Sequence, residues 1–211
     1  MEQITFVPTF ESWQNAARRA LSGDQAPEQI VWEELGSEQP GLAMFEEPAD
    51  ASGEGTKRFR VPKAFVELAG RVACHRDPRR WALLYRVLWR LTHGESRLLD
   101  VVVDPDVYEL VRMDKAVRHD VHKMRAFVRF RVVAHQGETW HVAWFEPEHH
   151  IVEKNAAFFR DRFAQMHWSI LTPERCVHWD GQHLTFTVGV PKSEAPTEDV
   201  VEDLWRTYYG N

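Results

Sequence analysis

The 211-residue sequence has few cysteines, no long apolar run and none of the common nucleotide-binding motifs. Its two cysteines, Cys74 and Cys176, are too few for a disulfide scaffold or for a cluster held by four thiolates. Apolar stretches such as 98–103 are short and interrupted by charge, so none spans a bilayer. The glycine-rich dinucleotide fingerprint and the Walker phosphate loop are both missing. These absences argue against a radical enzyme with its own iron–sulfur cluster, a dinucleotide-dependent oxidoreductase and a Walker ATPase.

The composition is that of a water-soluble globular protein. Hydrophobic residues make up 44% of the chain and charged residues 27%, which is enough for a packed core. Residues 1–13 lack the basic start and apolar run of a secretory signal. We therefore expect one cytoplasmic domain over residues 1–211 that does not contact a membrane.

Charge is strongly segregated along the chain. The net formal charge is −9 over residues 1–56, +9 over residues 57–131 and −6 over residues 132–211. A basic middle segment in an acidic protein indicates a local anionic partner. The alternative is that arginines of the middle segment pair with carboxylates within the fold.

The hydrophobic pattern predicts an α+β fold, with a single domain and an antiparallel sheet packed against several helices. We expect helices within 10–21, 62–75, 79–90, 106–126, 147–163 and 198–209. We expect strands within 4–7, 29–34, 128–132, 140–145, 168–171, 176–179 and 183–190, with a tight turn at Asp180-Gly181. Residues 36–57 are rich in glycine, proline, serine and acids, and are predicted to be a mobile loop.

The predicted helix over 106–126 has an apolar face and, opposite it, a basic face. Two arginines alternate with apolar residues directly after this helix, as expected for side chains that point outward from a strand. The resulting nucleic-acid-binding candidates are Arg112, Lys115, His119, His122, Lys123, Arg129 and Arg131.

Five residues are candidates for catalysis: Asp120, His122, Lys123, Glu146 and His149. Lys123 would be a Schiff-base nucleophile if burial lowered its pKa, with Asp120 as its acid–base partner. The alternative for Lys123 is an ion pair with a carboxylate or a phosphate. Glu146 and His149 would do acid–base work at a strand end, or alternatively cap the following helix.

His119 and His122 lie three residues apart on a predicted helix, a spacing that presents two imidazoles to one metal ion. Further ligands would have to come from distant residues, namely His149, His150, Cys176 or His178. No carboxylate stands at the spacing of a known zinc motif. We therefore interpret these histidines as exposed or hydrogen-bonded, and expect neither a metal nor a cofactor.

Several longer motifs occur together and in order along the chain. They are FESW (10–13), VPKAF (61–65), CHRDP (74–78), VHKMRAFVRFR (121–131), WFEPEHHI (144–151), WSILTP (168–173), WDG (179–181) and LWRTYY (204–209). With these motifs the chain resembles a bacterial domain-of-unknown-function family described as a probable DNA metabolism or repair protein. That family occurs beside a radical-SAM protein similar to spore photoproduct lyase, and N-terminal to UdgX-type uracil-DNA glycosylases.

The resemblance implies a DNA-repair accessory domain with two partners: DNA, and a uracil-DNA glycosylase domain or radical-SAM repair protein. The chain lacks the cysteines and glycosylase motifs of those enzymes, so their chemistry is not implied. Family members continue beyond the LWRTYY motif, so we expect an excised domain or a shortened member. Two alternatives stay open: a stand-alone DNA glycosylase, lyase or hydrolase that uses the His/Lys/Glu cluster, and a protein-docking module for the repair enzyme.

Overall fold

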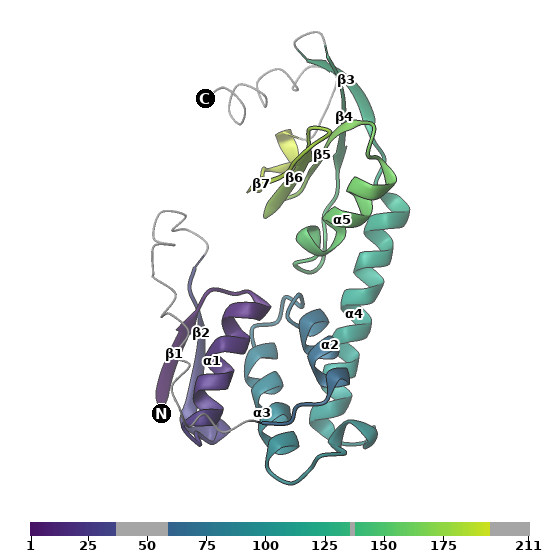
Figure 1. The fold of residues 1–211 in the computed structure, drawn as a ribbon. Coiled ribbons are helices and arrows are strands. Elements are labelled where there is room, and N and C mark those ends of the chain that lie inside the picture. Colours follow the sequence, from purple (N-terminus) through teal and green to yellow (C-terminus); the bar gives the residue numbers. More distant parts are fainter. Residues whose placement is uncertain (37–58, 136–137, 195–211) are drawn as a thin grey trace. The chain divides into compact units, whose positions relative to one another are not determined.

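The computed structural model describes residues 1–36, 59–135 and 138–194. The chain divides into two compact units, residues 1–116 and residues 117–211. Helices and strands occur in both units, so the predicted α+β class is confirmed (Figure 1).

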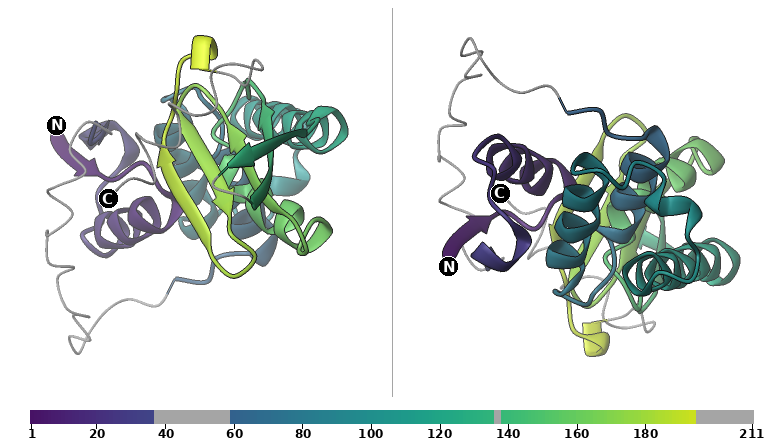
Figure 2. Two further views of the ribbon diagram at one scale, coloured as in Figure 1. Left: turned by 90° about the horizontal axis from the view of Figure 1, so that it is seen from above. Right: turned by 90° about the horizontal axis from the view of Figure 1, so that it is seen from below.

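The first unit begins with a strand–helix–strand motif (Figures 1 and 2). Strands β1 (Glu2–Phe6) and β2 (Ile30–Glu34) pair in parallel, and helix α1 (Phe10–Ser22) connects them. Thr9 starts α1 because its side-chain oxygen accepts the N–H of Ser12 at 3.2 Å. Both predicted strands and the predicted helix are therefore present.

Helices complete the first unit. They are α2 (Lys63–Val72), α3 (Arg80–Thr92) and the first part of α4 (Pro105–Phe127), with short 3₁₀ turns η1 (Pro27–Gln29) and η2 (Leu98–Asp100). Their buried faces enclose a cluster of aromatic rings. The rings of Phe6 and Trp81 meet edge to face with centroids 5.1 Å apart, and Trp13 stacks on Trp81 at 5.8 Å. Aromatic burial on this scale supplies much of the apolar area that stabilises the unit.

The second unit contains a five-stranded sheet in the order β3-β4-β5-β6-β7. Every neighbouring pair is antiparallel except β4 and β5, which are parallel. The predicted antiparallel sheet is thus confirmed, with one parallel pair that α5 connects. The elements are β3 (Arg131–His135), β4 (Glu138–Trp144), α5 (Val152–Arg162), β5 (His167–Leu171), β6 (Arg175–Trp179), β7 (Leu184–Val188) and η3 (Lys192–Glu194).

Helix α5 covers one face of this sheet, where Phe159 contacts Trp168 with ring centroids 6.1 Å apart (Figure 1). The turn between β6 and β7 is the predicted one. The Asp180 side chain accepts the N–H groups of Gln182 and His183, and Gly181 has a φ of 88°, which favours glycine.

The predicted strand over 128–132 is wrong in its first half, because β3 begins only at Arg131. Helix α4 continues to Phe127, and the side chain of Arg129 hydrogen-bonds the carbonyls at its end. Arg129 therefore lies between helix and strand. The predicted helix over 198–209, and the predicted loop at 36–57 apart from Gly36, lie outside the described residues.

Within the described parts of the chain, no helix is both long enough and apolar enough to cross a lipid bilayer.

Candidate functional site

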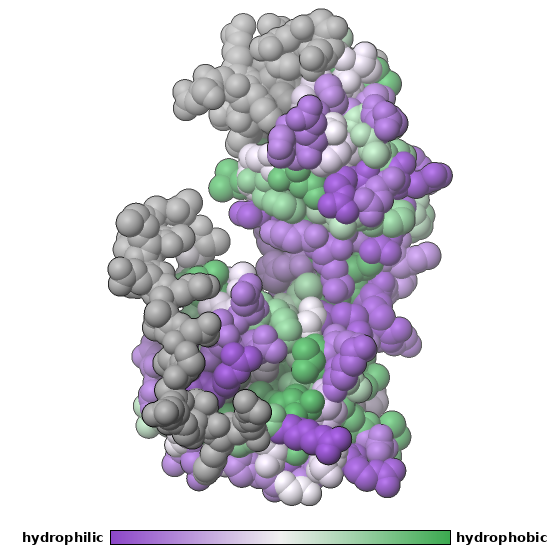
Figure 3. Space-filling model, in the orientation of Figure 1, coloured by the Kyte–Doolittle hydropathy of each residue, from purple (hydrophilic) through white to green (hydrophobic). Residues whose placement is uncertain are grey.

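Five of the seven predicted nucleic-acid-binding residues lie in the second unit, on the last part of α4 and in the segment that leads into β3. Between residues 117 and 131, every solvent-accessible titratable side chain is basic, and the one acid, Asp120, is only 2% exposed. In Figure 3 hydrophilic side chains occur along this part of α4, with hydrophobic ones between them. We call this surface the basic face; it consists of Arg118, His119, His122, Lys123, Arg125, Arg129 and Arg131.

Two arginines of the basic face are held in place by neutral groups. Arg125 donates from Nε to the amide oxygen of Asn155 at 2.8 Å, and its guanidinium lies 4.5 Å from the ring centroid of Phe158. Asn155 is fully buried in α5, and its amide nitrogen contacts the sulfur of Met124. The position of Arg125 is therefore fixed while its charge is not cancelled by these partners.

Arg129 is held in the same way by backbone oxygens. Its Nη1 donates to the carbonyls of Ala126 at 2.7 Å and Val128 at 3.0 Å. These are carbonyls at the C-terminal end of α4, where the helix dipole amounts to about half a negative charge. A whole positive charge on Arg129 leaves this end net positive.

The other two predicted cations on α4, Arg112 and Lys115, belong to the first unit. Arg112 pairs with Glu109 at 2.6 Å, and this hydrogen bond raises the pKa of Arg112 and lowers that of Glu109. Lys115 is exposed. The charge of Arg112 is therefore matched by a neighbouring carboxylate, unlike the charges of Arg125 and Arg129.

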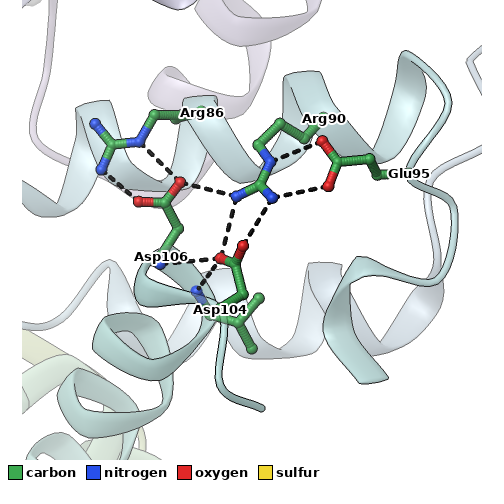
Figure 4. A network of polar contacts seen from close by, with 6 residues as sticks. Arg86, Arg90, Glu95, Asp104 and Asp106 are labelled. Carbon is green, nitrogen blue, oxygen red and sulfur yellow. Dashed lines mark hydrogen bonds and ion pairs between the residues drawn. The ribbon is translucent and has the colours of Figure 1, made fainter. Parts of the chain in front are cut away.

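Arginines of α3 in the first unit are bound by carboxylates in a network (Figure 4). Arg90 contacts Glu95 and Asp104 at 2.7 Å each and Asp106 at 3.1 Å, while Arg86 contacts Asp106 at 2.6 Å. Hydrogen bonds from Arg90 lower the pKa of Glu95 and of Asp104. For these arginines, the geometry supports the alternative interpretation of the basic middle segment, in which arginines pair with carboxylates within the fold.

Among the catalytic candidates, Asp120 ties α4 to the loop before α5. One carboxylate oxygen accepts the N–H of His149 at 2.9 Å, and the other has no hydrogen-bond partner among the described residues. Burial raises the pKa of Asp120. The role that these contacts support is to position the loop.

Lys123 lies beside this loop and pairs with Glu148 at 2.7 Å. The hydrogen bond to Glu148 raises the pKa of Lys123, and the same bond lowers the pKa of Glu148. An amine nucleophile needs the opposite shift, toward neutrality at physiological pH. The geometry therefore favours the ion-pair interpretation of Lys123 over the Schiff-base interpretation.

The structure brings Asp120, Lys123 and His149 together, but Glu146 has other partners. Glu146 contacts Lys192 at 2.7 Å and accepts the indole N–H of Trp144 at 3.0 Å, and both hydrogen bonds lower its pKa. His122 is exposed on α4. The five catalytic candidates thus do not form one hydrogen-bonded site.

No three or more His, Cys, Asp or Glu side chains within residues 1–36, 59–135 and 138–194 are arranged to hold a metal ion. His178 instead contacts the hydroxyls of Ser169 and Thr187, each at 2.9 Å, and burial lowers its pKa to about 4. Neither Cys74 nor Cys176 forms a disulfide with another described residue.

Three residues that shape the basic face were not among the predicted candidates, namely Arg118, Arg125 and Asn155. Arg125 occurs in the conspicuous 121–131 motif, and it lies three residues after His122, close to it on the same helix face. The sequence indicates a role for Asn155 only weakly. It is a polar residue one helical turn before the core residue Phe159, on the same side of the helix. Only the packing of α5 beside α4 identifies it as the partner of Arg125.

Comparison with known proteins places the sequence in a family but not in a functional class. No curated protein and no solved structure matches it. Residues 78–211 match the model of a family described as a domain of unknown function, DUF4130. This range holds more than half of the chain and includes the basic face. The chain therefore belongs to the DUF4130 family of domains of unknown function.

Proposed function

We propose that the protein is an accessory domain of DNA repair that binds nucleic acid through the basic face. The observation that carries the proposal is the way in which Arg125 and Arg129 are held. Each guanidinium is positioned by neutral oxygens, namely an amide and two carbonyls, and keeps its charge available for a phosphate.

The other residues of the basic face add positive charge around these two arginines. A polyanion that neutralises several such cations releases counterions, which is the main source of affinity in non-specific nucleic-acid binding. The buried position of Asp120 supports the same interpretation, because the one acid in this segment is withdrawn from the surface that would meet the phosphates.

The repair context is supported by the motifs of the sequence and not by this geometry. The chain resembles a family that accompanies a uracil-DNA glycosylase or a radical-SAM repair enzyme. We therefore propose that the domain holds DNA for such a catalytic partner, with phosphate contacts that position the strand and leave base recognition to the enzyme.

Fluorescence anisotropy with labelled DNA at several salt concentrations tests the proposal. The wild-type chain should bind, with log affinity falling linearly against log salt. The double variant Arg125→Gln/Arg129→Gln removes two charges but keeps side-chain amides near the same acceptors. It should bind roughly ten-fold more weakly and lower the salt slope by about two.

The matched control is Arg18→Gln/Arg19→Gln on α1, which removes the same charge from exposed positions of the first unit. This control should keep wild-type affinity. Absence of binding at low salt, or equal losses in the two double variants, would show that the basic face is not the nucleic-acid surface.

A further inference from the structure

An aromatic side chain is exposed at the end of α4, beside the basic face. Phe127, the last residue of α4, is 65% exposed. Phe130, three residues later, is packed into the second unit, with ring centroids 5.3 Å from Phe163 and 6.1 Å from Trp168. One short segment thus directs one phenylalanine into the core and another into solvent.

Two cations lie close to Phe127, namely Arg129, which neutral carbonyls hold, and Lys123, which pairs with Glu148. Arg129 is hydrogen-bonded to the carbonyls of Ala126 and Val128, the two residues that flank Phe127. Lys123 lies one helical turn before Phe127 on the same side of α4. An exposed ring with cations fixed beside it is complementary to a ligand that combines flat apolar rings with phosphates.

We propose that Phe127 is a stacking platform for an unpaired nucleobase, so that the preferred ligand is single-stranded nucleic acid. This inference rests on the proposed function and specifies its substrate class. Bases within a duplex are covered on both sides by their neighbours, whereas an unpaired base offers a free face to an aromatic side chain. Stacking of this kind tolerates any base, and a phosphate next to the stacked base would contact Arg129, which is bound to the residues that flank Phe127.

The ring of Phe158 shows why Phe127 is the platform. The guanidinium of Arg125 lies over the Phe158 ring, with the guanidinium carbon 4.5 Å from its centroid. That face of Phe158 is already occupied. Phe127 stacks on no other ring within the described residues and is 65% exposed, so its ring is accessible to a ligand.

The test compares Phe127→Ala and Phe127→Leu with the wild-type chain, using a labelled oligo(dT) strand and a duplex of the same length. We expect each variant to bind oligo(dT) roughly 5- to 100-fold more weakly and to keep wild-type affinity for the duplex. Leucine restores apolar area but has no flat ring. A thermal unfolding midpoint equal to that of the wild type shows that both variants are folded.

A second measurement detects stacking directly. An oligo(dT) strand with one 2-aminopurine should change its fluorescence when the wild-type chain binds, and should not change with Phe127→Leu. Equal binding of oligo(dT) by the wild-type chain and the variants overturns the inference and leaves the proposed function intact. Rescue by leucine also overturns it, since that result indicates an apolar protein partner. Failure of the wild-type chain to bind either probe overturns the proposed function itself.

Discussion

The two units of the protein contain many arginines but hold them differently. In the first unit, Arg86 and Arg90 are surrounded by carboxylates at 2.6 to 3.1 Å. In the second unit, Arg125 and Arg129 are held by an amide and by backbone carbonyls. The first arrangement uses the charge to stabilise the fold, and the second arrangement leaves it for a ligand. A count of basic residues alone therefore does not predict where an anion binds.

The stability of the two units should also respond differently to acid. This difference is the largest effect on the free energy of unfolding that we expect. Burial lowers the pKa of His178 in the second unit to about 4. The neutral form therefore stabilises the folded state above pH 6.5, and that stability is lost as pH falls from 6.5 to about 4. The loss reaches about 3 kcal/mol. The variant His178→Asn should abolish this part of the pH dependence in urea unfolding experiments.

Carboxylates of the first unit should respond only at lower pH. The hydrogen bond from Arg79 lowers the pKa of Asp77 to about 2, so the stability it provides is lost as pH falls below 3.8. The raised pKa of Asp120 acts against His178, because it favours the folded state as pH falls. Unfolding of both units at the same pH, with no effect of His178→Asn, would contradict this assignment.

Removal of one arginine from the first unit should affect stability and not binding. Arg90→Ala leaves Glu95, Asp104 and Asp106 without their shared cation, and Arg90 is only 26% exposed. We expect a loss of about 2 kcal/mol in the free energy of unfolding. Affinity for oligo(dT) should remain at the wild-type value when measured well below the unfolding midpoint. A large loss of affinity in this folded variant would mean that the network contributes to the nucleic-acid surface.

Removing the carboxylate that pairs with one cation of the second unit should strengthen nucleic-acid binding, and this gain should be smaller than the effects described above. Glu148→Gln removes the carboxylate that pairs with Lys123. The pKa of Lys123 should fall back toward its ordinary value. The ammonium group of Lys123, no longer paired with Glu148, should then contact a phosphate of the nucleic acid. We expect a two- to five-fold higher affinity and a slightly steeper salt dependence, as expected for one additional phosphate contact. Weaker binding by this variant would instead place Glu148 among the groups that contact the ligand.

Much of the fold follows from local sequence patterns. The apolar spacing on α3 and the Asp180-Gly181 turn led to correct elements because their signals are contained within a few residues. The start of β3 was predicted three residues too early, since alternation in 128–132 has the period of a strand. Helix α4 ends at Phe127, and residues 128–130 form neither helix nor strand. There the side chain of Arg129 binds the carbonyls of Ala126 and Val128, a contact that alternation does not reveal.

The candidate site was predicted only in part, for a physical reason. Sequence shows which side chains are basic, and the helical period showed that several share a face. Whether a charge is cancelled depends on partners far along the chain, such as Asn155 for Arg125 and Glu148 for Lys123. The exposure of Phe127, three residues before the partly buried Phe130, likewise depends on tertiary packing.

The most direct test of the account is the salt dependence of DNA binding by Asn155→Asp. This change keeps the shape of a fully buried side chain and replaces a neutral partner of Arg125 with a charged one. If uncancelled charge makes the basic face a ligand surface, the variant should bind oligo(dT) several-fold more weakly, with a salt slope lower by about one. An unchanged slope and affinity in the folded variant would contradict the account.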